Sequence, residues 1–238
     1  MKVLHAHWQN LVFVNYKCPE KVLLDYLPHL TRLDMFQGSY YLSLVGFLFR
    51  DTNFLGVKVP FISKFEEVNL RFYVKKNLGG KVVKGVSFIK EYVPNKLVTA
   101  FARGVFKEAY RTCKMSHCFS KSDDSFFCTY QWQNKNLSSL EVVTSLESKL
   151  TEPDSLEAFI TEHYYGYTKV GAMKTFEYRV EHPRWEYYPV KEFNINVDFV
   201  GLYGENFGFL NNQKPDSVFF CKGSDVSIFS PKLIKHGV

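Results

Sequence analysis

The chain has 238 residues, a mass of 27.8 kDa and a formal net charge of +6 at pH 7. Hydrophobic residues make up 46% of the sequence, which excludes a disordered chain, and we expect one domain over residues 1–238. The sequence has 23 Phe and 15 Tyr, a content that favours β-structure and aromatic-lined cavities. Because no apolar run approaches about 18 residues, we expect no membrane partner.

The positive charge is mild and does not predict a nucleic-acid partner. The densest basic group is Lys75, Lys76, Lys81 and Lys84, which flanks a predicted hairpin turn at Asn77–Gly80. A nucleic-acid interface usually gathers its basic residues into a stripe. We therefore interpret this group as a solvated loop.

The five cysteines indicate a reducing compartment. Their number is odd, no pair has C-x-x-C spacing, and the N-terminal residues lack the apolar core of a signal peptide. We expect unpaired thiols and a cytoplasmic protein. The segment 113–118, with Cys128 beyond it, lacks the tight repeated spacing of structural zinc sites, so we expect no metal and no cofactor.

In chain order, hydrophobic patterns predict a mainly β fold with a few peripheral helices. A first helix is predicted at Pro19–Leu27 and a second at about Lys96–Arg111, while a third begins after Asp154 as cap, with Glu157 completing a capping box. The predicted strands are Tyr40–Phe49, Phe65–Val74, Phe126–Gln133, Thr175–His182, Phe193–Tyr203, Ser217–Lys222 and Val226–Phe229.

The strand Phe65–Val74 is the most informative segment. Alternation places Val68, Leu70, Phe72 and Val74 on one face, and Phe65, Glu67, Asn69, Arg71 and Tyr73 on the other. The polar face suits either solvent or the wall of a cavity, and its flanking aromatic residues favour the cavity. Glu67 and Arg71 are about 13 Å apart along a strand, so each needs another partner or a ligand.

Glu108 is the second candidate. In a helix over 96–111 it continues the apolar stripe of Leu97, Phe101 and Val105, where a carboxylate is costly unless paired. It is therefore either an acid facing a pocket or a residue that reaches solvent at the helix end. Arg103 and Tyr110 occupy another side of the same predicted helix.

A third cluster contains His163 and Tyr164, with His182 and Trp185 further along the chain. Satisfied structural histidines are more common than ligands, and both interpretations stay open. The sequence lacks G-x-S-x-G, P-loop and G-x-G-x-x-G motifs, which removes those hydrolase and nucleotide-binding classes.

These segments resemble the uncharacterised bacterial DUF2071, or YqjF-like, family. The resemblance spans nearly the whole chain and is carried by Ala6–Trp8, Leu27–Pro28, Leu42–Phe47, Phe65–Val74, Gly85–Glu91, Ala102–Arg103, Glu108–Tyr110 and Thr161–Tyr164. It implies the fold of acetoacetate decarboxylase, a double-layered, cone-shaped β-barrel around a pocket. Glu67 matches the position of a pocket glutamate in the decarboxylases.

The resemblance also bears on chemistry. The Schiff-base lysine of the decarboxylases follows a G-R-E-x-x-G-x-P-K-K pattern that is similar to residues 102–111 here. Tyr110 and Arg111 stand where that pattern has its two lysines. A tyrosine cannot form an imine, so the decarboxylase reaction is not expected.

The leading hypothesis is a pocket that binds a small anionic or oxygenated organic molecule. Arg71 and Arg103 would donate hydrogen bonds, and Glu67 and Glu108 are the candidates for proton exchange. The remaining candidate ligand contacts are Asn69, Tyr110, His163, Tyr164 and Trp185. Two alternatives are a non-Schiff-base enzyme that uses a carboxylate as general acid or base, and an interaction protein with a vestigial pocket. A homo-oligomer is left open.

Overall fold

Long strands and short helices alternate along the chain. The computed structural model describes residues 1–58, 60 and 62–235. The strands are β1 (Lys2–Cys18), β2 (Arg32–Leu33), β3 (Tyr40–Phe54), β4 (Val57–Lys58), β5 (Phe65–Leu78), β6 (Lys81–Val93), β7 (Tyr110–Thr112), β8 (Lys114–Lys121), β9 (Ser125–Gln133), β10 (Leu137–Ser145), β11 (Tyr165–Gly171), β12 (Lys174–Glu181), β13 (Tyr188–Asn196), β14 (Ser217–Phe229) and β15 (Lys232–Ile234). The helices are α1 (Glu20–Leu24), α2 (Lys96–Val105), α3 (Leu156–Thr161), α4 (Phe199–Tyr203) and the 3₁₀ helix η1 (Glu205–Asn211).

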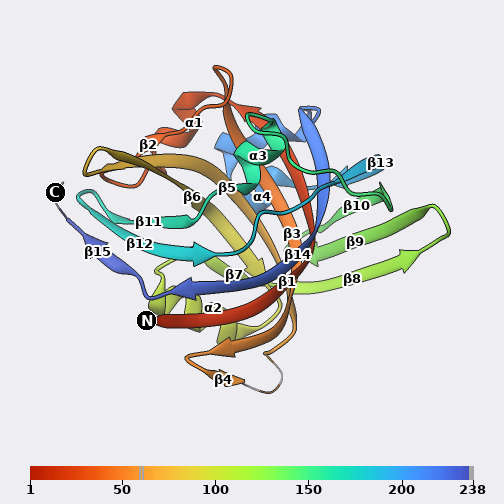
Figure 1. Cartoon of the computed structure of the whole chain (residues 1–238), viewed down its shortest axis with the longest axis horizontal. Coiled ribbons are helices and arrows are strands. Elements are labelled where there is room, and N and C mark those ends of the chain that lie inside the picture. Colours follow the sequence, from red (N-terminus) through yellow and green to blue (C-terminus); the bar gives the residue numbers. More distant parts are fainter. Residues whose placement is uncertain (59, 61, 236–238) are drawn as a thin grey trace.

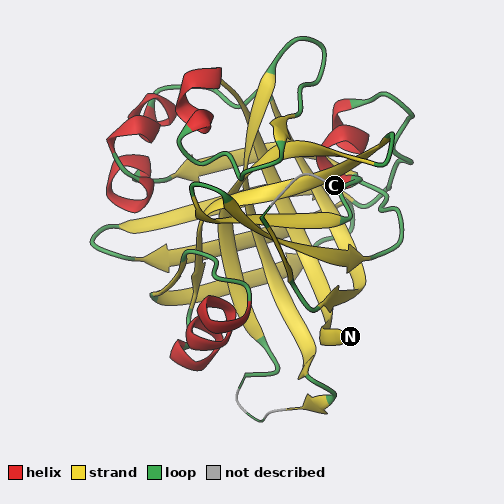
Figure 2. Ribbon diagram, turned by 90° about the vertical axis from the view of Figure 1, so that its left-hand side faces the viewer, coloured by secondary structure: helices red, strands yellow, loops and turns green. Residues whose placement is uncertain are grey.

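A closed ring of strands forms the centre of the molecule. Neighbouring strands pair in the order β12-β11-β6-β5-β3-β1-β14, and β12 pairs again with β14 through Val180 opposite Ile228. The seam between β11 and β6 is parallel and pairs Gly166 with Val86, whereas the other pairs in the ring are antiparallel. Figure 2 shows the helices at the periphery of this strand framework. The mainly β prediction is confirmed.

A second layer extends from the ring. Tyr188 of β13 pairs with Phe220 of β14, and β10, β9 and β8 continue the sheet outward. In Figure 1, β8 and β9 project to the right of the ring. Side chains between the layers form one apolar core, which includes Trp132 and Leu140 of the outer sheet and Leu70 of β5. A separate core lies inside the ring. This double layer agrees with the predicted barrel.

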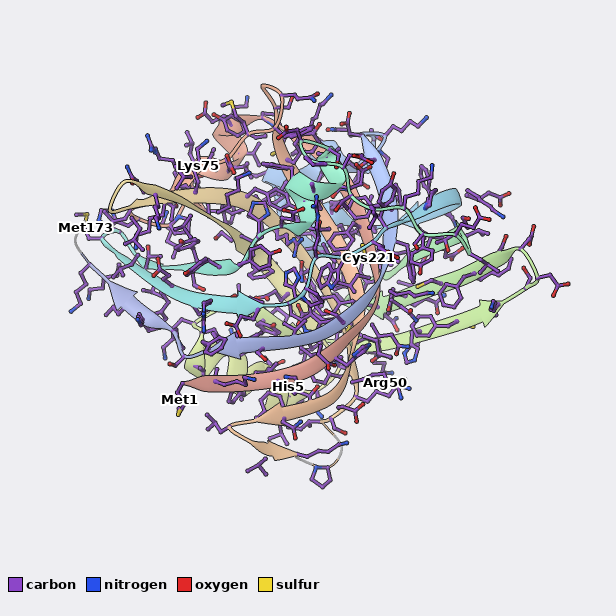
Figure 3. The ribbon with its side chains drawn as sticks, in the orientation of Figure 1. Met1, His5, Arg50, Lys75, Met173 and Cys221 are labelled. Atoms are coloured by element: carbon purple, nitrogen blue, oxygen red, sulfur yellow. The ribbon has the colours of Figure 1, made fainter. Side chains whose placement is uncertain are left out.

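Side chains fill most of the ring. In Figure 3 the space enclosed by the ribbon is densely occupied, Cys221 lies near its centre, and Met173 lies at the outer turn between β11 and β12. Cys221 and Cys128 are fully buried, and all five cysteines are free thiols. In the part of the chain that the structure describes, no helix is long and apolar enough to span a membrane.

Several predicted boundaries were wrong. The helix predicted to Arg111 ends at Val105, because Lys107 adopts a left-handed backbone with φ of 59°. The third helix is capped by Ser155, whose Oγ accepts from the Ala158 amide, because Asp154 itself has a φ of 63°.

Two strand predictions also changed. The segment 193–203 divides into the end of β13 and helix α4, because the Asp198 side chain accepts from the Gly201 amide and starts a helix there. Conversely, Ser217–Lys222 and Val226–Phe229 are parts of one strand, β14, which continues through Gly223 at a φ of 87°. The predicted turn at Asn77–Gly80 does join β5 to β6.

Gly166 tests how closely β12 packs against β11 in the ring. A Cβ atom at this position would overlap the ring of Tyr178 on β12, so Gly166→Ala must push that ring away. We expect a loss of about 1–3 kcal/mol in the free energy of unfolding, measured by urea denaturation. Gly104→Ala on α2 is the control, because nothing lies within 4 Å of its added Cβ. Equal midpoints for the two variants would contradict the close packing of Tyr178 against Gly166.

Candidate functional site

One face of β5 lines a cavity inside the ring. Glu67, Asn69 and Arg71 point into this cavity, while Val68 and Leu70 pack between the layers. The space inside the cavity that is open to the centre of a water molecule has a volume of about 70 Å³. The alternation in the sequence therefore describes β5 correctly. The surrounding wall is largely aromatic and includes Trp8, Phe47, Phe49, Phe65, Phe88, Phe101, Phe106, Tyr165 and Trp185.

Glu67 accepts two hydrogen bonds at the bottom of the polar wall. Asn69 Nδ2 donates to Oε1 at 2.9 Å, and Tyr110 Oη donates to Oε2 at 2.8 Å. Burial raises the pKa of Glu67 to about 7, against the opposing effect of these two donors and of the more distant Arg71. The side chain is only 3% exposed. Glu67 is thus a buried carboxyl that titrates near neutral pH.

Glu91 on β6 is a cavity residue that the sequence reasoning missed. Simple alternation from Phe88, which lines the cavity, would place Lys90 inside and Glu91 outside. A β-bulge reverses this, because Arg71 pairs with Phe88 while the preceding Leu70 pairs with Lys90, which leaves Ile89 as the extra residue.

After the bulge, Glu91 faces the cavity and lies between Asn69 of β5 and Tyr110 of β7 in the strand register. Its Oε2 is buried without a hydrogen-bond partner among the described residues. Burial, together with the nearby Glu108 and Glu67, raises the pKa of Glu91 well above its usual value.

Glu108 faces the cavity from the loop between α2 and β7, not from a helical stripe. The left-handed residue Lys107 turns the chain after α2, so that Glu108 is buried while Lys107 is exposed. Tyr178 Oη on β12 donates to Glu108 Oε1. Burial raises the pKa of Glu108 to about 8; the hydrogen bond from Tyr178 opposes this rise and the charge on Glu67 adds to it. The cavity-facing alternative for Glu108 therefore agrees with the structure.

These carboxyls share one side of the cavity. Glu67, Glu91 and Glu108 are each 6% exposed or less, and among the described residues none of them has a cationic partner within 4 Å. Three neighbouring carboxylates without a counter-ion repel one another, so the cluster retains protons at neutral pH. The described residues contain no His, Cys, Asp or Glu group arranged to hold a metal ion.

Further along β5, the cavity wall contains a cation. Arg71 Nη2 donates to the carbonyl of Ile160 at 3.0 Å, and its guanidinium lies over the ring of Phe13 at 5.3 Å. Its Nε is buried without a partner, and within the described chain no carboxylate approaches Arg71 within 4 Å. His163 beside it is 6% exposed, and neither of its ring nitrogens has a hydrogen-bond partner among the described residues. Burial lowers the pKa of His163 well below its usual value, so the imidazole is neutral.

Three further candidates lie in different positions. Trp185 lines the cavity, donates from Nε1 to Ser224 Oγ at 2.8 Å and stacks on His182 with ring centroids 4.2 Å apart. Tyr164 is half-buried behind His182, outside the cavity lining. Arg103 is exposed on α2 and also lies outside the lining, because the short helix turns this position to solvent.

None of the described residues that line the cavity is a lysine. Tyr110, which stands where the decarboxylase pattern has a lysine, is buried, and its hydroxyl donates to Glu67. Burial raises the pKa of Tyr110 well above its usual value, with the surrounding glutamates acting in the same direction. Tyr110 is consequently a neutral hydrogen-bond donor.

The raised pKa values of Glu67 and Glu108 predict a pH-dependent stability. Between about pH 4.5, where unfolded glutamates lose their protons, and pH 7–8, the folded state keeps protons that the unfolded state has released. The free energy of unfolding should therefore fall as the pH rises through this window. Glu108→Gln removes one of these groups and keeps an acceptor for Tyr178.

At pH 8 we expect Glu108→Gln to be more stable than the wild type by about 1 kcal/mol or more, since each tenfold change in proton affinity is worth about 1.4 kcal/mol. At pH 5 the two proteins should differ little. Urea denaturation at both pH values measures this, with the exposed Glu192→Gln as control. A wild type that is more stable at pH 8 than at pH 5, with no such change in Glu108→Gln, would contradict the assignment.

Solved structures with the same fold are known. Acetoacetate decarboxylase from Legionella pneumophila superposes with a TM-score of 0.65 at 9% identity, over 98% of this chain and 87% of that one. The enduracididine biosynthesis enzyme MppR, in its complex with pyruvate, gives 0.64 at 10% identity, over 97% and 90% of the two chains. An acetoacetate decarboxylase-like enzyme from Sphingomonas wittichii gives 0.64 at 8% identity, over 100% and 95%.

At these identities the likeness shows a shared fold. No curated protein sequence matches the chain. The sequence model of the family DUF2071, whose description is "Uncharacterized conserved protein", matches residues 5–225 and covers most of the ring, the outer sheet and the three buried glutamates of the cavity. The chain belongs to the DUF2071 family.

Proposed function

We propose that this protein binds a small organic carboxylate, with a second oxygen function, inside the ring. The observation that carries the proposal is the state of Arg71, a cation in the cavity wall with a buried, unpartnered Nε and no carboxylate within 4 Å in the described chain. An unpaired charge at a buried position is unfavourable. A ligand carboxylate would supply the missing partner through charge-assisted hydrogen bonds.

His163 supports an anionic ligand at the same end of the cavity. A neutral imidazole offers one N–H donor, and neither nitrogen of His163 has a partner in the described residues. The ring of Tyr73 packs beside His163 at 4.8 Å between centroids and lies 5.7 Å from the Arg71 guanidinium. This packing holds both groups in place.

The size and the opposite wall of the cavity limit the rest of the ligand. The space of about 70 Å³ that is open to the centre of a water molecule is enough for several waters or for a small organic molecule. Tyrosine hydroxyls and proton-carrying carboxyls at the far wall suit a carbonyl or hydroxyl oxygen of the ligand. Pyruvate, with which MppR forms a complex, has this size and both functions.

A vestigial pocket fits these observations less well. The cavity wall contains buried polar atoms without partners in the described residues, namely Asn69 Oδ1, Arg71 Nε, Glu91 Oε2 and both His163 nitrogens. Each such atom costs about 1–3 kcal/mol if it stays unsatisfied. If nothing occupied the cavity, replacing these polar groups with apolar residues would stabilise the folded protein. That all of them are present together therefore favours a bound ligand.

Arg71→Met tests the anion-binding role. We expect pyruvate to bind the wild type and its affinity to fall about 10- to 100-fold in Arg71→Met, since a hydrogen bond to a charged group is worth roughly 1.5–3 kcal/mol. Saturation-transfer NMR with pyruvate, and with acetone as its neutral counterpart, measures this. Arg103→Met on the exposed face of α2 serves as the matched control. Equal binding of acetone and pyruvate, or equal loss in both variants, would refute the anion site.

Borohydride treatment tests the absence of imine chemistry. The described cavity wall has no lysine, so we expect pyruvate and borohydride together to leave the mass of the intact protein unchanged. Intact-protein mass spectrometry detects a reduced adduct directly. An adduct on Lys107 or Lys90, the lysines near the wall in sequence, would require a different arrangement of this region.

A further inference from the structure

Two carboxyls in the cavity have opposite hydrogen-bond environments. Both oxygens of Glu67 accept hydrogen bonds, from Asn69 and Tyr110, and such donors favour the ionised form. Glu91 Oε2 has no hydrogen-bond partner among the described residues. Burial and the neighbouring Glu108 and Glu67 favour the protonated form of Glu91, against the smaller opposing effect of Tyr110. The groups around this pair are Asn69 and Arg71 on β5, Glu108 on the loop, Tyr110 on β7 and Tyr178 on β12.

We propose that Glu67 and Glu91 act as base and acid that exchange a proton on the carbon next to the carbonyl of a bound oxo-carboxylate. This inference rests on the proposed function, because Arg71 must hold the ligand carboxylate. It extends that function from binding to a reversible keto–enol proton transfer, and it assigns the acid to Glu91.

The step balances without any other reactant. The Glu67 carboxylate takes a proton from the carbon, and the C–H electron pair becomes the C=C bond of the enol. The carbonyl oxygen takes the proton of Glu91, which becomes a carboxylate. The reverse step restores the ketone and both side chains. In D₂O, exchange of these acidic protons with solvent places deuterium on the carbon.

The composition of the cavity wall favours proton transfer over covalent catalysis. Among the described lining residues there is no Lys, Ser or Cys, and the hydroxyls belong to tyrosines and Thr161. Tyr110 and Tyr178 are neutral donors, because burial and the surrounding glutamates raise the pKa of both well above its usual value. Acid–base catalysis requires two titratable groups whose surroundings give them different proton affinities.

Deuterium exchange measured by ¹H NMR tests the proposal. The wild-type protein should accelerate loss of the methyl signal of pyruvate in D₂O over the buffer rate. Glu67→Gln should abolish at least 99% of this acceleration, since a positioned general base contributes about 10²- to 10⁴-fold. Glu91→Gln keeps a hydrogen-bond donor but cannot release its proton as an acid, and should lose about 10-fold or more. Arg103→Met, on the exposed face of α2 and outside the cavity lining, is the control with wild-type exchange.

The pH profile distinguishes catalysis from a structural role. The rate should rise with pH as Glu67 ionises and fall as Glu91 loses its proton, giving a bell shape. Tyr110→Phe removes a hydrogen bond that lowers the pKa of Glu67, so the rising limb should move to higher pH. Thermal denaturation checks that each variant is folded.

Each outcome has one meaning. Pyruvate that binds, as detected by saturation transfer, without accelerated exchange overturns this inference and leaves the proposed function intact. Pyruvate that does not bind overturns the proposed function for this class of ligand. Acceleration that persists in folded Glu67→Gln overturns the assignment of the base, and an unchanged rate in Glu91→Gln overturns the assignment of the acid.

Discussion

The bulge in β6 is the constraint on which the chemistry of the cavity depends. Because Ile89 is an extra residue opposite β5, the strand changes phase between Phe88 and Glu91. Lys90 therefore turns toward helix α4, where it donates to the carbonyl of Leu202, and Glu91 turns inward. Without the bulge a lysine would face the same space. The shift of one residue in the register thus places a carboxylic acid in the cavity wall in place of a potential amine nucleophile.

The burial of Glu91 beside Glu67 and Glu108 makes the distribution of charge inside the ring uneven. Glu67, Glu91 and Glu108 lie close together without a cationic partner within 4 Å in the described chain, while Arg71 lies two residues beyond Asn69 on β5, near neutral His163. Desolvation raises the proton affinity of carboxyls and lowers that of imidazoles. The result is a polarised cavity, with a cation at one end and proton-carrying donors at the other.

The fold of this protein therefore does not by itself determine the chemistry of its cavity. The scaffold is that of acetoacetate decarboxylase, with nearly complete coverage of both chains at about one-tenth identity. The described cavity wall, however, has no lysine, and Tyr110 presents there a neutral hydroxyl that is hydrogen-bonded to Glu67. A shared scaffold supports different reactions when the groups that line its site differ. The identity of the residues inside the ring decides the chemistry.

The sequence alone determined the mainly β class, the polar face of β5 and the hairpin after it, because strand alternation and turn residues are local properties. It did not reveal Glu91, the exposure of Arg103 or the loop position of Glu108. Those depend on a bulge fixed by pairing with β5, and on the left-handed residue Lys107, which ends α2 early. Only the closed ring, which brings β6, β7 and β12 against β5, decides which polar residues meet, because those contacts join residues distant in sequence.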